Sequence, residues 1–258
     1  MKNVIYAYKN IGETPLECLE RVRIENGIDT DVPMTYAGRL DPMAEGQMII
    51  LVGEECKNKE KYLGLDKEYE IEILFGFSTD SYDVLGLLNN VSENSCKEKS
   101  VPERLSDTRS GAESSTAARD FSGNILSKYI KKFHQEYPRY SSKIIAMKEL
   151  PEEMPTKEVE IYSIENLGTR QIKGAELIKE IINKINLVKG DFRQKEITAR
   201  WSSISSDIVD TDFTILKLRV KCSSGTYMRS LAHRIGLDMG TQAIAYSIKR
   251  LFLFTYER

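Results

Sequence analysis

An aspartate on a constrained loop is the first residue of this sequence that could act chemically. In "YAGRLDPMAEGQMIILVGE" (36–54), Asp41 lies between Gly38 and Pro42, and an apolar run follows. Proline fixes its own φ and biases the preceding residue toward an extended conformation, whereas glycine permits sharp bends. The carboxylate is therefore held on a stiff loop. It acts there either as a reactive group or as a turn-closing residue, since Asp before Pro is common in turns.

A tyrosine and a lysine share one face of a predicted strand. The stretch "KEYEIEILFGF" (67–77) alternates apolar and charged residues, which is typical of a half-buried strand. Its glutamates are expected to face water. Tyr69 then points inward, and Lys67 lies at the start of the strand on the same side.

An arginine begins a predicted helix in the last quarter of the sequence. "TILKLRVKCSSGTYMRSLAHRIG" (214–236) predicts a strand, a tight turn at Gly225 and a helix capped by Thr226. Arg229 lies in the first turn of that helix, where a cation gains nothing from the helix dipole. A buried carboxylate is therefore its expected partner.

Patterned segments elsewhere supply the elements that position these residues. "ETPLECLERVRIENG" (13–27) opens with a capping box and predicts a helix. Residues 157–167 alternate as a strand, and residues 125–133 and 175–188 follow helical periods. Residues 92–123 are rich in Ser and charge and poor in large apolar side chains, so we expect a flexible insertion there.

Composition limits the class of protein. A chain of 258 residues with 41% hydrophobic and 29% charged residues is typical of a globular protein with one or two lobes. Its apolar runs are shorter than a bilayer span and the N-terminus lacks a signal-peptide core, so a cytoplasmic protein without membrane contact is expected. Four widely spaced cysteines and two distant histidines argue against a metal site, a disulfide framework and a Ser-His-Asp triad.

Charge is distributed unevenly along the chain. The net charge is −2, but residues 213–258 carry eight Lys or Arg and two acids, so this quarter has a balance of +6 and the remainder −8. The basic quarter either faces a polyanion or forms an ordinary solvated surface.

Three motifs, in order, resemble those of the TruB-type tRNA pseudouridine synthases. "GRLDPMAEG" resembles the family's nucleophile loop, and "KEYEIEILFGFSTDSYDVLG" resembles its Lys-x-Tyr strand with the downstream Thr-Asp and Asp-x-x-Gly pattern. "CSSGTYMRSLAHRIG" resembles its Gly-Thr-Tyr-x-Arg turn. Weaker matches are "YKNIGETPLECLERVR", "YPRYSSK" and "IKRLFLF".

The resemblance implies a role for each matching residue. Asp41 would be the nucleophile and Arg229 its ion-pair partner. Tyr69 would stack on the target uracil, Lys67 would support that pocket, and Leu251 would pack against the base. In such enzymes the carboxylate attacks a flipped nucleotide, the glycosidic bond breaks, and uracil C5 rejoins the sugar carbon. No cofactor or metal is implied.

The sequence also departs from the family pattern. Tyr36 and Ala37 stand where the family usually has a His-Thr pair, so Tyr36 is expected to stack at the substrate site, which Arg39 adjoins. Residues 174–206 are expected to form an extra helical insertion. The sequence stops soon after "IKRLFLF", so we expect no C-terminal PUA domain of the kind that many relatives append.

We therefore expect an α+β protein with the pseudouridine synthase fold over residues 1–258, built as one catalytic domain. Its mixed, largely antiparallel sheet would be flanked by helices and carry an RNA-binding cleft. The expected enzyme is an isomerase that converts uridine 55 in the T-loop of tRNA, acting as a monomer that binds the T-arm without a protein partner. The alternatives are a TruB-like RNA-binding or tRNA-folding protein with weak or no turnover, and a pseudouridine synthase acting on another RNA.

Overall fold

The computed structural model describes residues 3–89, 125–141 and 153–254. The flexible insertion expected at residues 92–123 lies outside these ranges. So does the end of the stretch "YPRYSSK", whose first part forms a turn in which the Ser141 N–H donates to the Pro138 carbonyl oxygen at 2.9 Å.

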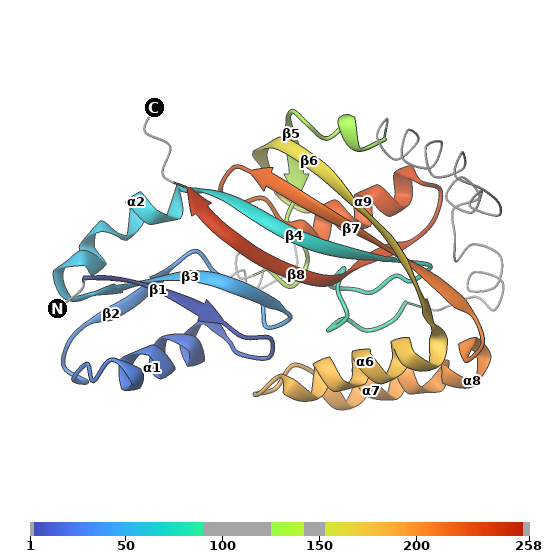
Figure 1. Cartoon of the computed structure of the whole chain (residues 1–258), viewed down its shortest axis with the longest axis horizontal. Helices are drawn as coiled ribbons and strands as arrows, with labels where there is room; N and C mark the ends of the chain where they lie inside the picture. The colour runs from blue at the N-terminus through green and yellow to red at the C-terminus, as the bar shows by residue number, and fades with distance from the viewer. Residues whose placement is uncertain (1–2, 90–124, 142–152, 255–258) are drawn as a thin grey trace.

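A mixed, mostly antiparallel sheet organises the described part of the chain (Figure 1), as the sequence predicts. Its strand order is β1-β3-β8-β4-β7-β6-β5, and β2 pairs with β3 beside this path. The strands are β1 Val4–Lys9, β2 Met34–Ala37, β3 Ala44–Val52, β4 Asp66–Phe75, β5 Lys132–Glu136, β6 Thr156–Lys173, β7 Asp212–Cys222 and β8 Ala243–Phe254.

One short parallel seam joins the first three strands to the rest of the sheet. Ala44–Gly46 of β3 pairs with Ile248–Arg250 of β8. Gly46 has a φ of +116°, and a Cβ at this position would overlap the backbone of Arg250. Only glycine permits this approach without a shift of the backbone. The seam therefore brings the Asp41 loop against the final described strand.

Helices cover the sheet in three places. In Figure 1, α1 lies below β1–β3 and the α6–α7 pair lies below the other end of the sheet, while α9 packs on β8 and β4. The helices are α1 Pro15–Glu25, α2 Lys59–Leu63, α6 Gly174–Leu187, α7 Gln194–Ser203, α8 Ser205–Ile208 and α9 Met228–Asp238, and the 3₁₀ turn η1 spans Gly53–Asn58.

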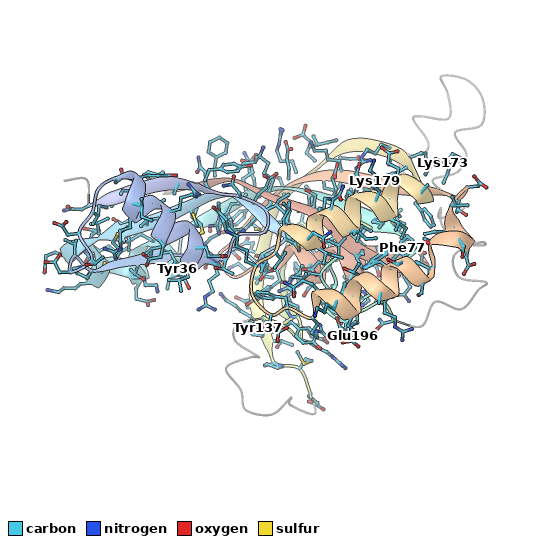
Figure 2. The ribbon with its side chains drawn as sticks, turned by 90° about the horizontal axis from the view of Figure 1, so that it is seen from below. Tyr36, Phe77, Tyr137, Lys173, Lys179 and Glu196 are labelled. Carbon is cyan, nitrogen blue, oxygen red and sulfur yellow. The ribbon has the colours of Figure 1, made fainter. Side chains whose placement is uncertain are left out.

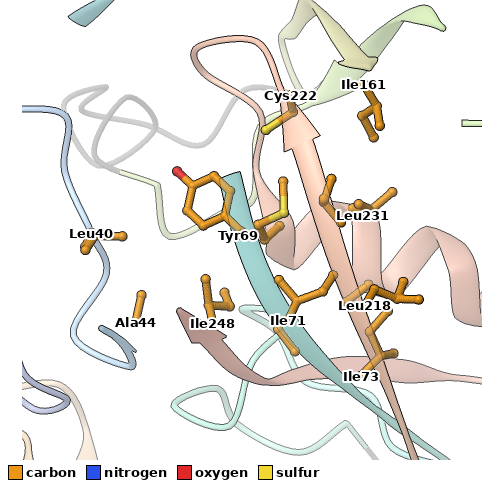
Figure 3. Packing of buried hydrophobic residues seen from close by; sticks show 14 of the residues in the cluster. Leu40, Ala44, Tyr69, Ile71, Ile73, Ile161, Leu218, Cys222, Leu231 and Ile248 are labelled. Atoms are coloured by element: carbon orange, nitrogen blue, oxygen red, sulfur yellow. The ribbon is translucent and has the colours of Figure 1, made fainter. Parts of the chain in front are cut away.

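Two hydrophobic clusters fill the space between these layers. The first lies between the sheet, α1 and α9, and Figure 3 shows part of it around Tyr69, Ile71, Ile73, Leu218, Leu231 and Ile248. The second holds α6 and α7 against the sheet (Figure 2). There the fully buried Trp201 packs on Phe77, with ring centroids 5.2 Å apart, and Phe77 packs on Phe213 at 4.8 Å.

Most elements lie where the periodic patterns predict them. In α1 the capping box is complete, because the Glu17 N–H donates to Thr14 Oγ1 at 3.2 Å and the Thr14 N–H donates to Glu17 Oε2 at 2.7 Å. The helix predicted for 175–188 is α6, and the strands predicted for 67–77 and 157–167 are β4 and β6.

Three local predictions are wrong: two concern a helix and a helix cap, and the third concerns the glutamates of β4. The helix expected over residues 125–133 is present only at residues 125–127; a turn follows and then β5, which pairs with β6 from Lys132 onward. Backbone pairing with a neighbouring strand outweighs a helical pattern of this length. Thr226 does not cap α9; its hydroxyl donates to the Ser223 carbonyl oxygen at 2.9 Å, and Tyr227 is the N-cap.

The glutamates of β4 face cations rather than open water. Glu70 lies 2.8 Å from Arg219 Nη2 and 2.9 Å from Lys217 Nζ, both on the adjacent strand β7. Glu68 is buried and lies 3.6 Å from Arg219 Nε. Cross-strand neighbours of opposite charge therefore satisfy this face of the sheet.

Candidate active site

The loop between β2 and β3 carries Asp41. It turns at Gly38, whose φ is +77°. Its second half is tied by backbone hydrogen bonds, because the Ala44 N–H donates to the Asp41 carbonyl oxygen and the Gly12 N–H donates to the Pro42 carbonyl oxygen, each at 2.9 Å. The backbone that follows the carboxylate is thus held by β3 and by the chain around Gly12.

Lys9 supports this loop from β1. Its side chain is fully buried, and Nζ donates to the carbonyl oxygens of Ala44 at 2.6 Å, Asn10 at 2.9 Å and Pro42 at 3.5 Å. Burial lowers the pKa of Lys9 to about 8. The ammonium group therefore satisfies carbonyls directly after Asp41 that would otherwise be buried without partners.

Arg250 supports the same loop from β8. Its guanidinium is 1% exposed and donates from Nε to the Gln47 carbonyl oxygen at 2.7 Å. Nη2 donates to Gly38 at 3.1 Å and Nη1 to Arg39 at 3.4 Å. The planar fork of arginine suits several fixed acceptors, which a lysine could not reach together. No motif in the sequence indicates this role, since the carbonyls meet Arg250 only in the folded chain.

Arg229, in the first turn of α9, lies beside Asp41. The distance between Arg229 Nε and Asp41 Oδ2 is 2.8 Å. The arginine side chain is 4% exposed and the aspartate 38%, so a buried cation holds a carboxylate that reaches the surface of a cleft. The Nε–H bond is not aligned with an acceptor, so the contact is an ion pair rather than a directed hydrogen bond.

Asp83 is a second carboxylate at this arginine, and sequence reasoning missed it. Its Oδ2 lies 3.7 Å from Arg229 Nε, and its side chain is 6% exposed. Its Oδ1 accepts hydrogen bonds from Ser81 Oγ at 2.6 Å and from the Leu85 N–H at 3.0 Å. Burial raises the pKa of Asp83, and the charge of Arg229 opposes that rise. The Asp-x-x-Gly pattern was the available signal.

The turn that carries Asp83 is also held by the arginine directly. Arg229 Nη1 donates to the Ser81 carbonyl oxygen at 3.0 Å. One guanidinium therefore binds the Asp41 carboxylate, the Asp83 carboxylate and this carbonyl. The cation that gains nothing from the helix dipole is stabilised by these three acceptors instead.

Tyr69 and Lys67 line the cleft next to Asp41. Tyr69 is 7% exposed and lies at the end of the row of aliphatic side chains that β4 contributes to the core (Figure 3). Burial raises its pKa, so the phenol stays protonated at neutral pH. Lys67 Nζ donates to the carbonyl oxygens of Leu63, at 3.0 Å, and Leu65. Burial, together with the charge of Arg250, lowers the pKa of Lys67 to about 8.

The cleft has a volume of about 510 Å³ and combines these groups in one concave surface. A carboxylate beside a buried guanidinium suits nucleophilic attack without a metal, because the arginine orients the carboxylate. A tyrosine ring beside it suits an unstacked base. The remaining wall comes from α2, β6, β8, the turn before α9 and the first residue of α9, through residues that include Glu60, Lys157, Ser224, Tyr227, Met228 and Ile248.

Two of the expected substrate-binding residues lie elsewhere. Among the described residues, the cleft wall includes Arg39 and Lys67 but neither Tyr36 nor Leu251. Tyr36 is half-buried on β2, with the guanidinium carbon of Arg39 5.9 Å from its ring centroid, and Figure 2 places it on the β1–β3 part of the molecule. Leu251 occupies a β-bulge and has no register partner on β4, so its neighbours Ile248 and Arg250 line the cleft instead.

Within residues 3–89, 125–141 and 153–254, every helix is too short or too polar to cross a bilayer.

Comparison with known proteins identifies relatives along most of the sequence. Residues 32–181 match the model of the family described as "TruB family pseudouridylate synthase (N terminal domain)". The chain is 24% identical over 251 residues to tRNA pseudouridine synthase B of Clostridium acetobutylicum, covering 97% of this chain and 67% of the relative. It is 26% identical over 216 residues to the protein of that name from Borreliella afzelii, covering 83% and 57%. The chain thus spans between about half and two thirds of these relatives.

Solved structures with the same fold carry lower sequence identity. The chain superposes on one in a Cbf5-Nop10-Gar1 complex with a TM-score of 0.55 at 17% identity, covering 97% of this chain and 48% of that one. The chain superposes on one in a structure of an H/ACA RNP bound to a substrate RNA containing 2'-deoxyuridine with a TM-score of 0.52 at 16% identity, covering 97% of this chain and 47% of that one. These similarities show the fold.

Proposed function

Because this chain belongs to the TruB family of pseudouridylate synthases, we propose that it isomerises uridine to pseudouridine at position 55 in the T-loop of tRNA. The observation that carries the proposal is the ion pair of Asp41 with the buried Arg229, at the edge of a cleft that Tyr69 lines. The names of the sequence relatives support tRNA as the substrate.

Each group in the cleft has a part in the proposed reaction. The ionised Asp41 attacks the flipped nucleotide, and the glycosidic C–N bond breaks. The uracil turns while it stacks on Tyr69, C5 bonds to the sugar carbon as the Asp41 carboxylate leaves that carbon, and the C5 proton passes to water. Arg229 pairs with the Asp41 carboxylate and keeps it aimed at the cleft. Stacking of a base on an aromatic ring is worth ~1 to 3 kcal/mol.

The T-arm of tRNA is the proposed partner, bound by a monomer in the cytoplasm without a second protein. Arg39 and Lys67 support this binding from the cleft wall. Residues 174–206 are proposed as an insertion, and the family match runs to residue 181, inside α6.

Tritium release tests the proposal. Only replacement of hydrogen at uracil C5 frees tritium from a tRNA transcript labelled at that position, so the protein should release it stoichiometrically with the target uridine. Asp41→Asn removes the nucleophile and keeps the shape of the side chain. It should abolish release while the Kd for tRNA stays within a few fold.

The alternatives predict other results. Release by Asp41→Asn at the wild-type rate would refute the assignment of the nucleophile. Tight tRNA binding by the wild type without any release would favour an RNA-binding or tRNA-folding protein. Mapping the product distinguishes position 55 from a uridine in another RNA, and size measurement in solution tests the monomer.

A further inference from the structure

The loop between α6 and α7 reaches the side of the cleft that carries Asp41. A second cavity of about 260 Å³ opens there, and it shares Asp41 and Arg229 with the first. Its outer wall is made by Tyr140 and by Asp191, Phe192 and Arg193 of the loop. The segment 174–206, which the sequence predicts as an extra helical insertion, therefore contributes to the surroundings of the proposed nucleophile.

The end of α6 rests on the chain that supports the Asp41 loop. Gly12 has a φ of +88°, and a Cβ there would overlap the carbonyl group of Leu187 at the end of α6. The N–H of the same glycine donates to Pro42, directly after Asp41. Figure 2 shows α6 and α7 side by side as one unit, so this contact fixes the whole hairpin relative to the cleft.

Arg193 anchors the other side of the loop. Its Nη1 lies 2.9 Å from Asp80 Oδ2 and its Nη2 lies 3.4 Å from Asp80 Oδ1, which is a bidentate ion pair. Asp80 is itself fixed, because its Oδ1 accepts the Leu87 N–H at 2.9 Å. The guanidinium carbon lies 4.5 Å from the ring centroid of Tyr140. Arg193 also has a φ of +62°, a conformation that costs a non-glycine residue ~1 to 3 kcal/mol.

These contacts determine which ligand the pair suits. Asp80 neutralises the guanidinium and occupies two of its nitrogens, so little charge remains for a phosphate. The group stays planar, is held rigid by Asp80 and Tyr140, and lines a cavity next to Asp41. Guanidinium planes and tyrosine rings are the surfaces on which unpaired RNA bases stack. The chemistry therefore favours a nucleobase over a phosphate.

We propose that Tyr140 and Arg193 form a stacking subsite for the nucleobase adjacent to the uridine in the cleft, with the α6–α7 loop as its wall. The subsite rests on the proposed function, since it places the neighbouring nucleotide of the same RNA. It makes residues 188–193 a determinant of which RNA loop is accepted.

A cycle of protein and RNA changes tests the subsite. T-arm stem-loops with an abasic nucleotide on either side of the target uridine are compared with the intact stem-loop. For the wild type, the abasic change on one of the two sides should lower kcat/KM about tenfold, as expected for loss of one stacked base. Arg193→Lys keeps the positive charge but loses the planar group. Its kcat/KM on intact RNA should therefore fall about as much as the abasic change lowers it for the wild type. On the abasic RNA, the same variant should lose little further kcat/KM.

Two further variants separate stacking from folding and charge. Tyr140→Leu removes the ring from a residue that is 42% exposed, so we expect the variant to fold, and it should reproduce the effect of Arg193→Lys. Lys195→Met removes an exposed cation of α7 outside the cavity and should match the wild type. The loss in Arg193→Lys should be the same at 50 and 200 mM salt.

Three outcomes would overturn the subsite. The first is wild-type activity of both Arg193→Lys and Tyr140→Leu on intact RNA. The second is a loss of kcat/KM in these variants that multiplies with the loss caused by the abasic nucleotide at each of the two positions. The third is a loss in Arg193→Lys that vanishes at high salt, which would indicate a phosphate contact. If the wild type releases no tritium from any RNA, the proposed function fails instead. The same cycle measured as Kd by fluorescence anisotropy then still tests the stacking.

Discussion

The ring of Tyr82 stacks on the imidazole of His233, with centroids 4.1 Å apart and planes inclined by 11°. Tyr82 lies between Ser81 and Asp83, the two residues of that turn that contact Arg229. His233 follows Arg229 by one turn of α9. The stack therefore joins the turn that supplies the second carboxylate to the helix that supplies the arginine.

Loss of this stack should lower turnover more than binding. In His233→Ala the Ser81–Asp83 turn loses its packing on α9. We therefore expect kcat to fall about threefold to tenfold while KM stays within twofold of the wild type. This loss corresponds to the energy of one aromatic pair. Steady-state tritium release measures both constants. Tyr82→Phe keeps the stack and should match the wild type; a loss confined to KM would contradict this role.

Asp83→Asn should destabilise the fold as well as slow the reaction. It leaves the buried Arg229 with one carboxylate and places an amide where Oδ2 stood. We expect the free energy of unfolding to fall by ~1 to 3 kcal/mol. Urea denaturation measures this change. Asp212→Asn breaks an exposed ion pair with Lys173 and serves as the control, with an expected cost of less than ~1 kcal/mol. Equal costs for the two variants would show that burial of Asp83 is unimportant.

The charge of Lys67 should appear in the pH dependence of kcat/KM. Its pKa is lowered to about 8, so the free enzyme carries the charge below that pH and loses it above. If this charge attracts RNA, kcat/KM should fall as the pH rises through about 8. Lys67→Arg stays protonated and should remove the fall. A fall that persists in Lys67→Arg would assign the titration to another group such as Lys9, whose pKa is also about 8.

Arg250→Lys should loosen the Asp41 loop. A lysine cannot donate to Gln47, Gly38 and Arg39 at once, so at least one buried carbonyl loses its partner. We expect a loss of ~1 to 3 kcal/mol in the free energy of unfolding and a lower kcat. Lys249→Met changes the neighbouring residue on the opposite face of β8 and should cost little. Unchanged kcat in a folded Arg250→Lys would show that the loop needs no support from β8.

Sequence periodicity predicted the elements whose burial is one-sided. The alternation of β4 and the apolar stripe of α6 are strong because each presents one face to a core. The segment 125–133 was mispredicted because its apolar spacing fits a helix, whereas β6 offers a backbone edge that only the folded chain reveals. The apolar pattern of a sequence indicates which side chains are buried. It does not indicate which strand has an edge free for backbone pairing.

The site was predictable in part for a similar reason. The position of Arg229 at a helix start called for a carboxylate, and Asp41 lies there, yet Asp83 was missed because ordinary turn chemistry explains an Asp near a glycine equally well. Lys9 and Arg250 act on backbone carbonyls, which every residue has. No spacing in the sequence indicates which carbonyls a buried cation will meet.

The parallel seam between β3 and β8 predicts an order in which the cleft assembles during folding. The pairing of β2 with β3 closes a short loop, so the Asp41 turn can form early at low entropic cost. The pairing of Ala44 with Ile248 joins segments far apart in sequence, and contacts of that kind form slowly. Since Arg250 belongs to the same seam, a nascent chain can display its aspartate before any cleft exists. In a refolding experiment, RNA binding would then appear when β3 pairs with β8, and not at the initial collapse of the chain.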